Sequence, residues 1–359
     1  MKKKLLVFGY NMQMGGAEKA LTDTLKYLSP FCEIDLYLLK KEGTLLSEVP
    51  SNVNIYQMRN NIFSYLLFRF IPFFRKRKIN KIANKKDYYA VFGYMEGRSG
   101  TWVADIKKKI KKYAWIHNDV FKFDIGISDK EAKNTYNKLD KVICVSKQAK
   151  ENFCKKYGIS SNKVIVIYNF INEEEILKKA DAFKVNNKRF TFVNVAKMRD
   201  QKRQDRLVKA AKVLKEEGFD FEIQLIGDGP NYEKIKKMVE DYNVSDIVIL
   251  KGLQTNPYPY IKNADFFILT SYMEGYGIVI KEALLLKTKI VTTRVTGPVE
   301  ILENGKYGLI IENTDEAVID KMREILLNKN NYKNLEKVLY NYKGDNEIIK
   351  KQTLKLLDL

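Results

Sequence analysis

Residues 266–293 read FFILTSYMEGYGIVIKEALLLKTKIVTT, and they carry the clearest pattern of secondary structure in the chain. Residues 266–269 are an apolar run typical of a buried strand, residues 271–277 form a short loop with two glycines, and residues 278–286 have helical patterning. A second apolar run, 290–293, follows the predicted helix. The order strand, loop, helix, strand predicts one unit of a parallel α/β sheet.

The loop before the predicted helix has the composition of an anion-binding turn. Gly275 and Gly277 let the backbone turn tightly and approach a ligand, and the unpaired N–H groups at the start of a helix attract an anion. Glu274 precedes the turn, and Glu282 lies about five residues into the helix, roughly 7 Å further along it. A diphosphate at the turn would have one carboxylate near each end of a nucleotide-sugar. The alternative is an ordinary βα turn with a solvated helix face.

Glu274 and Glu282, joined as EGYGIVIKE, resemble the E-x7-E signature of the retaining GT-B glycosyltransferases of family GT4. The resemblance extends over essentially the whole chain. It implies an α/β fold of the GT-B type, with two Rossmann-like parallel-sheet domains facing a cleft. It also implies a retaining hexosyltransferase that moves a sugar from a nucleotide-sugar, expected to be a UDP-sugar. The implied acceptor is a glycan or lipid-linked oligosaccharide in surface polysaccharide or glycoconjugate biosynthesis.

The resemblance assigns donor-binding roles to residues of several loops. Glu282 is expected to hold the ribose hydroxyls. Ligands bind at the carboxyl ends of the strands in open α/β sheets, and the other candidates follow predicted strands. Glu274, Gly275, Tyr276 and Gly277 are expected to hold the sugar. The other donor-site candidates are Gly15 and Gly16 after strand 4–9, Gly227 and Asp228 after strand 222–226, and Leu253 after strand 247–250. For Gly15 and Gly16, a tight turn without a ligand is the alternative.

A basic loop follows the predicted strand 190–195 and precedes an amphipathic helix. It carries Lys197, Arg199 and Lys202, as charge-assisted binding of a diphosphate requires. Lys202 matches the family's pattern and is expected to stabilise the leaving diphosphate. Either Lys197 or Arg199 can take the second basic position, and this choice stays open. A solvated basic loop is the alternative.

His117 is the only histidine among the 359 residues, and it ends the predicted strand 113–117. A lone histidine is more often structural than catalytic. The resemblance, however, places a histidine near the donor sugar at this point of the fold. We therefore expect a catalytic role for His117 beside Glu274 and Lys202.

The sequence lacks the patterns of several other kinds of site. Asp220-Phe-Glu222 resembles a D-x-D loop but lies in or beside an apolar strand, and the three cysteines have no metal-ligand spacing. We therefore expect no metal and no cofactor, so that Lys, Arg and backbone N–H groups neutralise the leaving diphosphate. A single histidine leaves no Ser/His/Asp or Cys/His nucleophile set, and no P-loop is present. Hydrolase and ATPase functions thereby lose their main support.

The net charge of +20 is concentrated in the first half of the chain. Residues 1–168 carry 32 Lys and Arg and 15 Asp and Glu, a net charge of +17, whereas residues 169–359 carry 32 and 29, a net charge of +3. Nucleic acid, an anionic membrane or a phosphorylated acceptor could each explain this charge.

Residues 63–86 favour an anionic membrane over nucleic acid as the partner. Residues 49–86 contain no acid, and residues 63–74 include six aromatic side chains. Aromatic groups settle at the acyl boundary and each basic residue adds roughly 1 kcal/mol at an anionic surface, so this segment, with its eight basic residues, is expected to bind anionic lipid. The alternative is a core helix with a solvated basic face. Pro72 would break or kink a single helix here.

We expect an acceptor-binding domain at residues 1–168, a nucleotide-sugar-binding domain at 169–340, and a helix at 341–359 that crosses back to the first domain. An odd number of cysteines and the lack of an apolar run of about 20 residues favour a cytoplasmic protein, at most peripheral on the cytoplasmic face of the membrane. Two rival functions remain: a GT-B sugar-nucleotide epimerase, and a non-catalytic protein that binds nucleic acid or membranes.

Overall fold

The computed structural model describes residues 2–58 and 71–359 of the chain. Contacts between residues divide the chain into two compact units, Met1–Ile171 together with Asp345–Leu359, and Asn172–Gly344. The expected boundaries after residues 168 and 340 lie a few residues earlier than these. The last helix belongs to the first unit.

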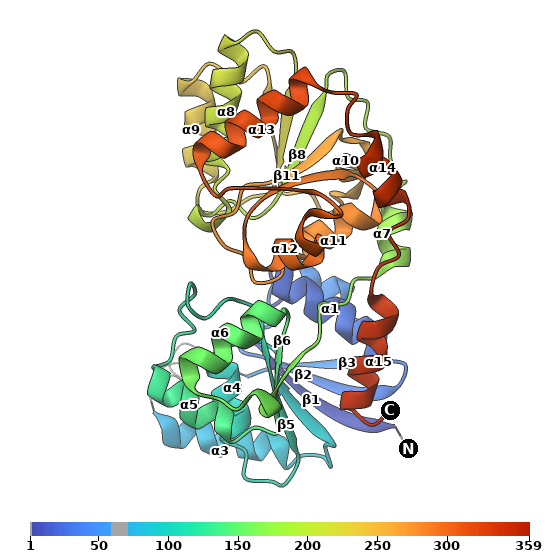
Figure 1. Ribbon diagram of the computed structural model, residues 1–359. Coiled ribbons are helices and arrows are strands. Elements are labelled where there is room, and N and C mark those ends of the chain that lie inside the picture. The colour runs from blue at the N-terminus through green and yellow to red at the C-terminus, as the bar shows by residue number, and fades with distance from the viewer. Residues whose placement is uncertain (1, 59–70) are drawn as a thin grey trace. The chain divides into compact units, whose positions relative to one another are not determined.

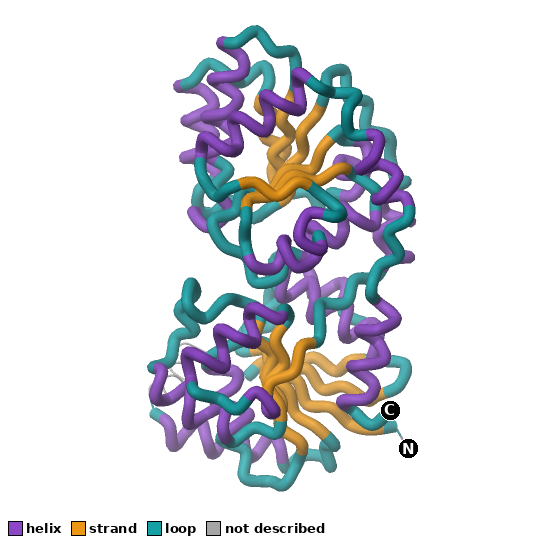
Figure 2. Tube along the Cα trace, in the orientation of Figure 1, coloured by secondary structure: helices purple, strands orange, loops and turns teal. Residues whose placement is uncertain are grey.

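A parallel sheet forms the centre of the first unit (Figures 1 and 2). In the described part of this unit the sheet has seven strands in the order β3-β2-β1-β4-β5-β6-β7. The strands are β1 (Lys3–Gly9), β2 (Cys32–Leu38), β3 (Val53–Gln57), β4 (Ala90–Gly93), β5 (Lys111–Ile116), β6 (Lys141–Cys144) and β7 (Val164–Val166). The α-helices are α1 (Gly16–Leu28), α3 (Pro72–Ala83), α4 (Arg98–Ala104), α5 (Asp129–Asn137), α6 (Lys147–Tyr157) and α15 (Asn346–Leu356).

Helices lie on both sides of this sheet, so its central strands are apolar on both faces (Figure 1). In β1, Leu5, Leu6 and Phe8 have no exposed surface, and an uninterrupted apolar run is typical of a buried parallel strand. The end of α15 is held on the same unit, because Lys3 donates a hydrogen bond to the carbonyl of Leu357 at 2.8 Å.

The second unit is also built around a parallel sheet. Its described strands follow the order β10-β9-β8-β11-β12-β13. They are β8 (Thr191–Val195), β9 (Glu222–Ile226), β10 (Val248–Gly252), β11 (Phe266–Leu269), β12 (Lys289–Thr293) and β13 (Leu309–Ile311). The α-helices are α7 (Glu173–Ala180), α8 (Asp205–Glu216), α9 (Tyr232–Asp241), α10 (Tyr258–Asn263), α11 (Ile278–Leu285), α12 (Thr296–Ile301), α13 (Asp315–Leu327) and α14 (Lys333–Tyr340). In Figure 1, α8, α9 and α13 lie together on one side of this sheet, and α10, α11 and α12 lie on the other.

Two parallel-sheet, Rossmann-like units confirm the expected α/β fold class. The strands β9 and β11 have the bounds expected from the sequence. The strands β3 and β13 were not expected. β3 lies at the edge of its sheet with only Val53 buried, and β13 has three residues, so neither gives a strong apolar pattern.

The described part of the expected membrane segment begins with α3, whereas residues 63–70 lie outside the described residues. Pro72 is the first helical residue of α3, a position where proline costs no helical hydrogen bond. Phe73 and Phe74 are 66% and 45% exposed, and their rings contact each other edge to face. Ile79 on the same helix is buried in the core.

The basic residues of α3 do not all face solvent. Arg75 pairs with Asp105 at 3.0 Å. Lys78 donates to the carbonyl of Met58, and burial lowers the pKa of Lys78. Arg75 and Lys78 therefore contact the unit itself, because α3 packs one of its sides on the unit. Membrane binding by this segment stays a prediction. No helix among the described residues combines the length and the apolar character needed to cross a membrane.

Candidate active site

The loops that follow β8, β9 and β11 carry most of the expected donor-site residues. These strands are parallel neighbours, with β11 and β9 each paired to β8. The carboxyl ends of parallel strands meet at one edge of a sheet. The second unit therefore gathers its candidate residues at a single edge.

Lys202 and Glu274 form an ion pair between two of these loops. Nζ of Lys202 lies 2.5 Å from Oε1 of Glu274, and the hydroxyl of Ser271 donates to the same oxygen at 2.6 Å. The side chains of Lys202 and Glu274 are only 19% and 7% exposed. Partly buried charges need such partners because they have lost water. The structure thus brings together two residues that the sequence proposes for catalysis.

Backbone contacts between the same loops support this ion pair. The N–H of Tyr272 donates to the carbonyl of Gln201 at 2.8 Å, and the side-chain amide of Gln201 donates to the carbonyl of Met273 at 2.9 Å. The hydroxyl of Thr270 donates to the carbonyl of Arg203 at 3.0 Å. Residues next to Lys202 are therefore tied to residues next to Glu274.

Two glycines set the turn between Glu274 and α11. Gly277 immediately precedes α11 with φ +82°, in the left-handed region that favours glycine. Gly297, in α12, faces the backbone of this turn, and a Cβ atom there would lie 2.2 Å from the carbonyl oxygen of Tyr276. Only a glycine at 297 allows this approach. The position of Tyr276 therefore depends on a residue from a separate helix.

Glu282 lies within α11 and is 6% exposed. Its Oε1 accepts a hydrogen bond from the hydroxyl of Tyr258 at 3.0 Å. Tyr258 is itself buried and is the first residue of α10. A buried carboxylate needs donors of this kind. Tyr258 was not expected at the site, because its contact with Glu282 joins two different helices and leaves no local pattern in the sequence.

The turn after β9 contacts the basic loop. The N–H of Met198 donates to the carbonyl of Asp228 at 2.9 Å, and the N–H of Gly227 donates to the carbonyl of Gly252 at 2.8 Å. Leu253, which follows Gly252, is 47% exposed. Gly227, Asp228 and Leu253 thus lie on adjoining loops at this edge of the sheet.

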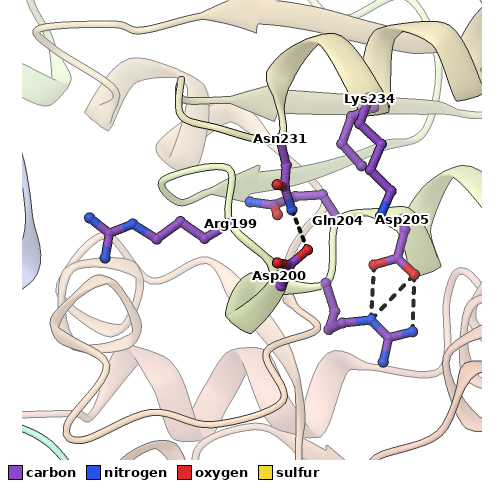
Figure 3. A pocket seen from close by; sticks show the side chains of 8 residues that line it. Arg199, Asp200, Gln204, Asp205, Asn231 and Lys234 are labelled. Atoms are coloured by element: carbon purple, nitrogen blue, oxygen red, sulfur yellow. Dashed lines mark hydrogen bonds and ion pairs between the residues drawn. The ribbon is translucent and has the colours of Figure 1, made fainter. Parts of the chain in front are cut away.

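The basic loop also borders a pocket beside α8 and α9 (Figure 3). Asn231 donates to Asp200 at 2.8 Å, and Arg203 pairs with Asp205 at 2.9 Å. The guanidinium of Arg199 extends away from the other labelled side chains (Figure 3). The pocket is lined by Arg199, Asp200, Arg203, Gln204, Asp205, Asn231, Lys234 and Ile235. Lys197 is half-buried outside this lining, so a diphosphate role for either Lys197 or Arg199 stays a prediction.

In the first unit, Gly15 and Gly16 lie where β1 leads into α1. Gly15 caps the helix with extended backbone, and Gly16 is its first residue. The N–H of Lys19 donates to the carbonyl of Gly15 at 2.9 Å. The expected βα turn is confirmed, and a donor-binding role for the two glycines stays a prediction.

His117 follows β5 and is 6% exposed. Its Nε2 lies 3.1 Å from the carbonyl oxygen of Tyr94, and a carbonyl only accepts, so Nε2 carries the proton. Within the described residues, Nδ1 is buried and has no hydrogen-bond partner. Burial lowers the pKa of His117, and the negative charge of Glu96 opposes that shift. The lowered pKa favours the neutral imidazole, in which Nδ1 is an acceptor.

Glu96 was not expected at the site from the sequence. Its carboxylate accepts a hydrogen bond from the backbone N–H of His117 at 3.0 Å. Glu96 follows β4 and His117 follows β5, and these strands are neighbours in the sheet. Only sheet pairing brings the two residues together, so no spacing in the sequence marks the contact.

Among residues 2–58 and 71–359, no group of three or more His, Cys, Asp or Glu side chains is placed to hold a metal ion. Asp220, from the weak D-x-D resemblance, pairs with Arg189 at 3.1 Å. Glu222 is the first residue of β9.

The chain matches two family models of glycosyltransferases. The family model described as glycosyl transferases group 1 matches residues 174–342, and the model for glycosyltransferase family 4 matches residues 14–175. A Campylobacter jejuni protein, N-acetylgalactosamine-N,N'-diacetylbacillosaminyl-diphospho-undecaprenol 4-alpha-N-acetylgalactosaminyltransferase, is 24% identical over 91% of this chain and 93% of its own length. A Staphylococcus aureus poly(ribitol-phosphate) alpha-N-acetylglucosaminyltransferase is 26% identical over 62% of this chain and 45% of its own length.

The fold has a counterpart among solved structures. Anabaena HepE, solved in complex with UDP and glucose, matches with a TM-score of 0.79 at 18% identity, over 99% of both chains. The two family models adjoin one another and together run from residue 14 to residue 342. Because each half of the chain matches its own model in the expected order, the chain belongs to the group 1, family 4 glycosyltransferases, and its fold is GT-B.

Proposed function

We propose that this glycosyltransferase moves a sugar from a UDP-sugar to a glycan or lipid-linked acceptor, with retention of configuration at the transferred carbon. The observation that carries the proposal is the pairing of Lys202 with Glu274, 2.5 Å apart, at a glycine-bearing turn that opens a helix. A diphosphate at this turn would meet an ammonium group and the positive end of the α11 dipole.

Each side chain of the proposed donor site has a distinct task. Lys202, with Lys197 or Arg199, stabilises the charge that develops on the leaving diphosphate. Glu274 accepts hydrogen bonds from sugar hydroxyls after Lys202 turns toward the diphosphate. Glu282, held by Tyr258, accepts hydrogen bonds from the ribose. The Lys202–Glu274 ion pair must open when the donor binds, because paired side chains neutralise each other and neither could contact the donor fully.

His117 supplies an acceptor for a sugar hydroxyl in this proposal. Its open nitrogen is Nδ1, which is buried and has no partner among the described residues. A neutral ring suits this task, because a protonated imidazole has no acceptor nitrogen.

The nature of the acceptor is inferred from relatives and from α3. The Campylobacter relative is named for a diphospho-undecaprenol acceptor and the Staphylococcus relative for poly(ribitol-phosphate). Exposed Phe73 and Phe74 beside exposed Lys76 and Arg77 suit the surface of an anionic membrane. We propose that the enzyme works at the cytoplasmic face of such a membrane, in the synthesis of a surface glycan.

A screen of nucleotides by thermal stabilisation tests the donor assignment. UDP and UDP-sugars are expected to raise Tm, whereas ADP and GDP at the same concentration are not. The Glu282→Gln variant should lose most of the stabilisation, and Glu151→Gln, an exposed acid in the first unit, should keep it. Stabilisation by GDP-sugars or ADP-sugars alone would refute a UDP donor.

Transfer is expected to continue in excess EDTA, because Lys202 and backbone N–H groups stabilise the leaving diphosphate. The assay measures sugar incorporated into acceptor with the donor found in the screen. Complete loss of activity that Mg²⁺ or Mn²⁺ restores would contradict this chemistry.

A further inference from the structure

Glu96 is a buried carboxylate at the carboxyl edge of the first sheet. It lies in the loop between β4 and α4, and it is 6% exposed. A carboxylate at this depth is costly unless hydrogen bonds replace its water. Its contacts therefore indicate what it holds in place.

Both oxygens of Glu96 bind the segment that carries the histidine. Oε2 accepts the backbone N–H of His117 at 3.0 Å, and Oε1 accepts the side-chain amide of Asn118. The backbone carbonyl of Glu96 accepts the hydroxyl of Tyr10 at 3.3 Å, which ties the loop to the end of β1. One carboxylate thus fixes two successive residues after β5.

The imidazole is oriented from the other direction by the end of β4. Its Nε2–H donates to the carbonyl of Tyr94 at 3.1 Å, and the rings of His117 and Tyr94 are 5.0 Å apart. The ring of Tyr94 in turn stacks on Trp115 at 5.1 Å, and its hydroxyl lies 3.1 Å from that of Thr24. A small shift of the His117 backbone would lengthen the Nε2 contact and turn Nδ1.

We propose that Glu96 is a positioning residue, which holds the backbone of His117 and the amide of Asn118 so that Nδ1 of the imidazole faces a hydroxyl group of the substrate. The proposal rests on the role given to His117 in the proposed function. A carboxylate suits this task better than an amide, because both of its oxygens accept, whereas a glutamine would set its NH₂ group against one of the two donors.

The single histidine makes the proposal measurable without an activity assay. We would label histidine with ¹⁵N and record long-range ¹H–¹⁵N spectra, in which one imidazole gives all the signals. The parent protein should show the Nε2–H tautomer. Glu96→Gln should change the ¹⁵N shifts toward a mixture of tautomers, and the charge-matched surface variant Glu151→Gln should leave them unchanged. Identical spectra for parent and Glu96→Gln would overturn the proposal.

A double-mutant cycle separates positioning from a general structural role. Glu96→Gln should lower turnover on the order of tenfold or more, as misplacement of a substrate-contacting group does. In a His117→Ala background, adding Glu96→Gln should lower turnover by less than about twofold. An equal loss in both backgrounds would show that Glu96 acts independently of His117 and would refute the proposal.

Two further results keep the inference separate from the proposed function. If Glu96→Gln does not fold, Glu96→Asp replaces it. The shorter side chain of aspartate keeps the charge but cannot reach both donors. Unchanged ¹⁵N shifts in Glu96→Asp would also overturn the proposal. If His117→Ala retains full turnover, the role of His117 in the proposed function fails. The spectra would then still decide whether Glu96 orients the ring.

Discussion

The carboxyl edges of the two sheets carry different kinds of polar side chains on similar loops. At the edge of the second sheet, Lys202 and Glu274 form an ion pair at 2.5 Å, and the lysine keeps 19% of its side chain exposed. At the edge of the first sheet, Glu96 and His117 are each 6% exposed, and burial lowers the pKa of the histidine. One edge holds a pair of opposite charges, and the other holds a buried hydrogen-bonding group.

The difference follows from what each edge would bind. A diphosphate brings its own negative charge, so a lysine that can leave its carboxylate partner gains a stronger one. A sugar hydroxyl is neutral and can meet a buried, preoriented nitrogen without desolvating an ion. Changes at the second edge should therefore affect the charge-dependent step, and changes at the first edge should affect orientation.

The largest effect is expected from Lys202→Ala. Turnover at saturating donor should fall by roughly 10² or more, the cost of removing a group that stabilises charge in the transition state. Steady-state rates with Lys236→Ala, an exposed lysine on α9, provide the control. Near-equal turnover in Lys202→Ala and the parent would contradict a charge-stabilising role for Lys202, and with it the proposed difference between the two edges.

Gly297→Ala should disturb the second edge without touching a charge. The added Cβ would lie 2.2 Å from the carbonyl oxygen of Tyr276, so the free energy of unfolding should fall by up to about 3 kcal/mol. Denaturant unfolding of the purified variant measures this loss. Gly218→Ala measures backbone strain without a close contact, because Gly218 has φ +82°, unlike Gly297, and a Cβ there would meet nothing within 4 Å. Equal stability of the two variants would argue against the close contact.

The first unit should bind anionic vesicles through α3. Replacing Lys76 and Arg77 by Gln should weaken binding by about 2 kcal/mol, at roughly 1 kcal/mol per basic residue. Co-sedimentation with vesicles containing phosphatidylglycerol measures the loss. Replacing Lys236 and Lys237, both exposed on α9, removes the same charge from the second unit. Equal binding by both double variants would assign the attraction to net charge alone.

The smallest expected effect is the pH dependence of stability that His117 contributes at the first edge. The pKa of His117 is lower in the folded protein than the ordinary value of about 6.5, so the unfolded chain binds the proton more readily. The stability contribution is fully present above about pH 6.5 and is lost as pH falls toward the folded pKa, by at most about 1.4 kcal/mol per pH unit.

Urea unfolding at several values between pH 5 and 7 tests this dependence in the parent and in His117→Gln. No other histidine titrates in this range. The variant should have a flatter stability profile. Parallel profiles would show that His117 is not shielded from protons.

Patterns of neighbouring residues were enough to predict the parallel α/β fold class and the glycosyltransferase family. Buried parallel strands read as continuous apolar runs, and the turn from Glu274 to Gly277 is encoded by neighbouring residues. The strands β3 and β13 were not predicted, because an edge strand or a three-residue strand buries too few side chains to leave an apolar pattern.

Tertiary structure alone decided which side chains meet. The contacts of Glu96 with His117, of Tyr258 with Glu282, and of Gly297 with Tyr276 each join separate elements. The same is true of α3, where packing turned Arg75 and Lys78 toward the unit and left Phe73 and Phe74 exposed. Local periodicity records whether a residue is buried, whereas its partner depends on sheet order and helix packing, which join residues that are distant in the chain.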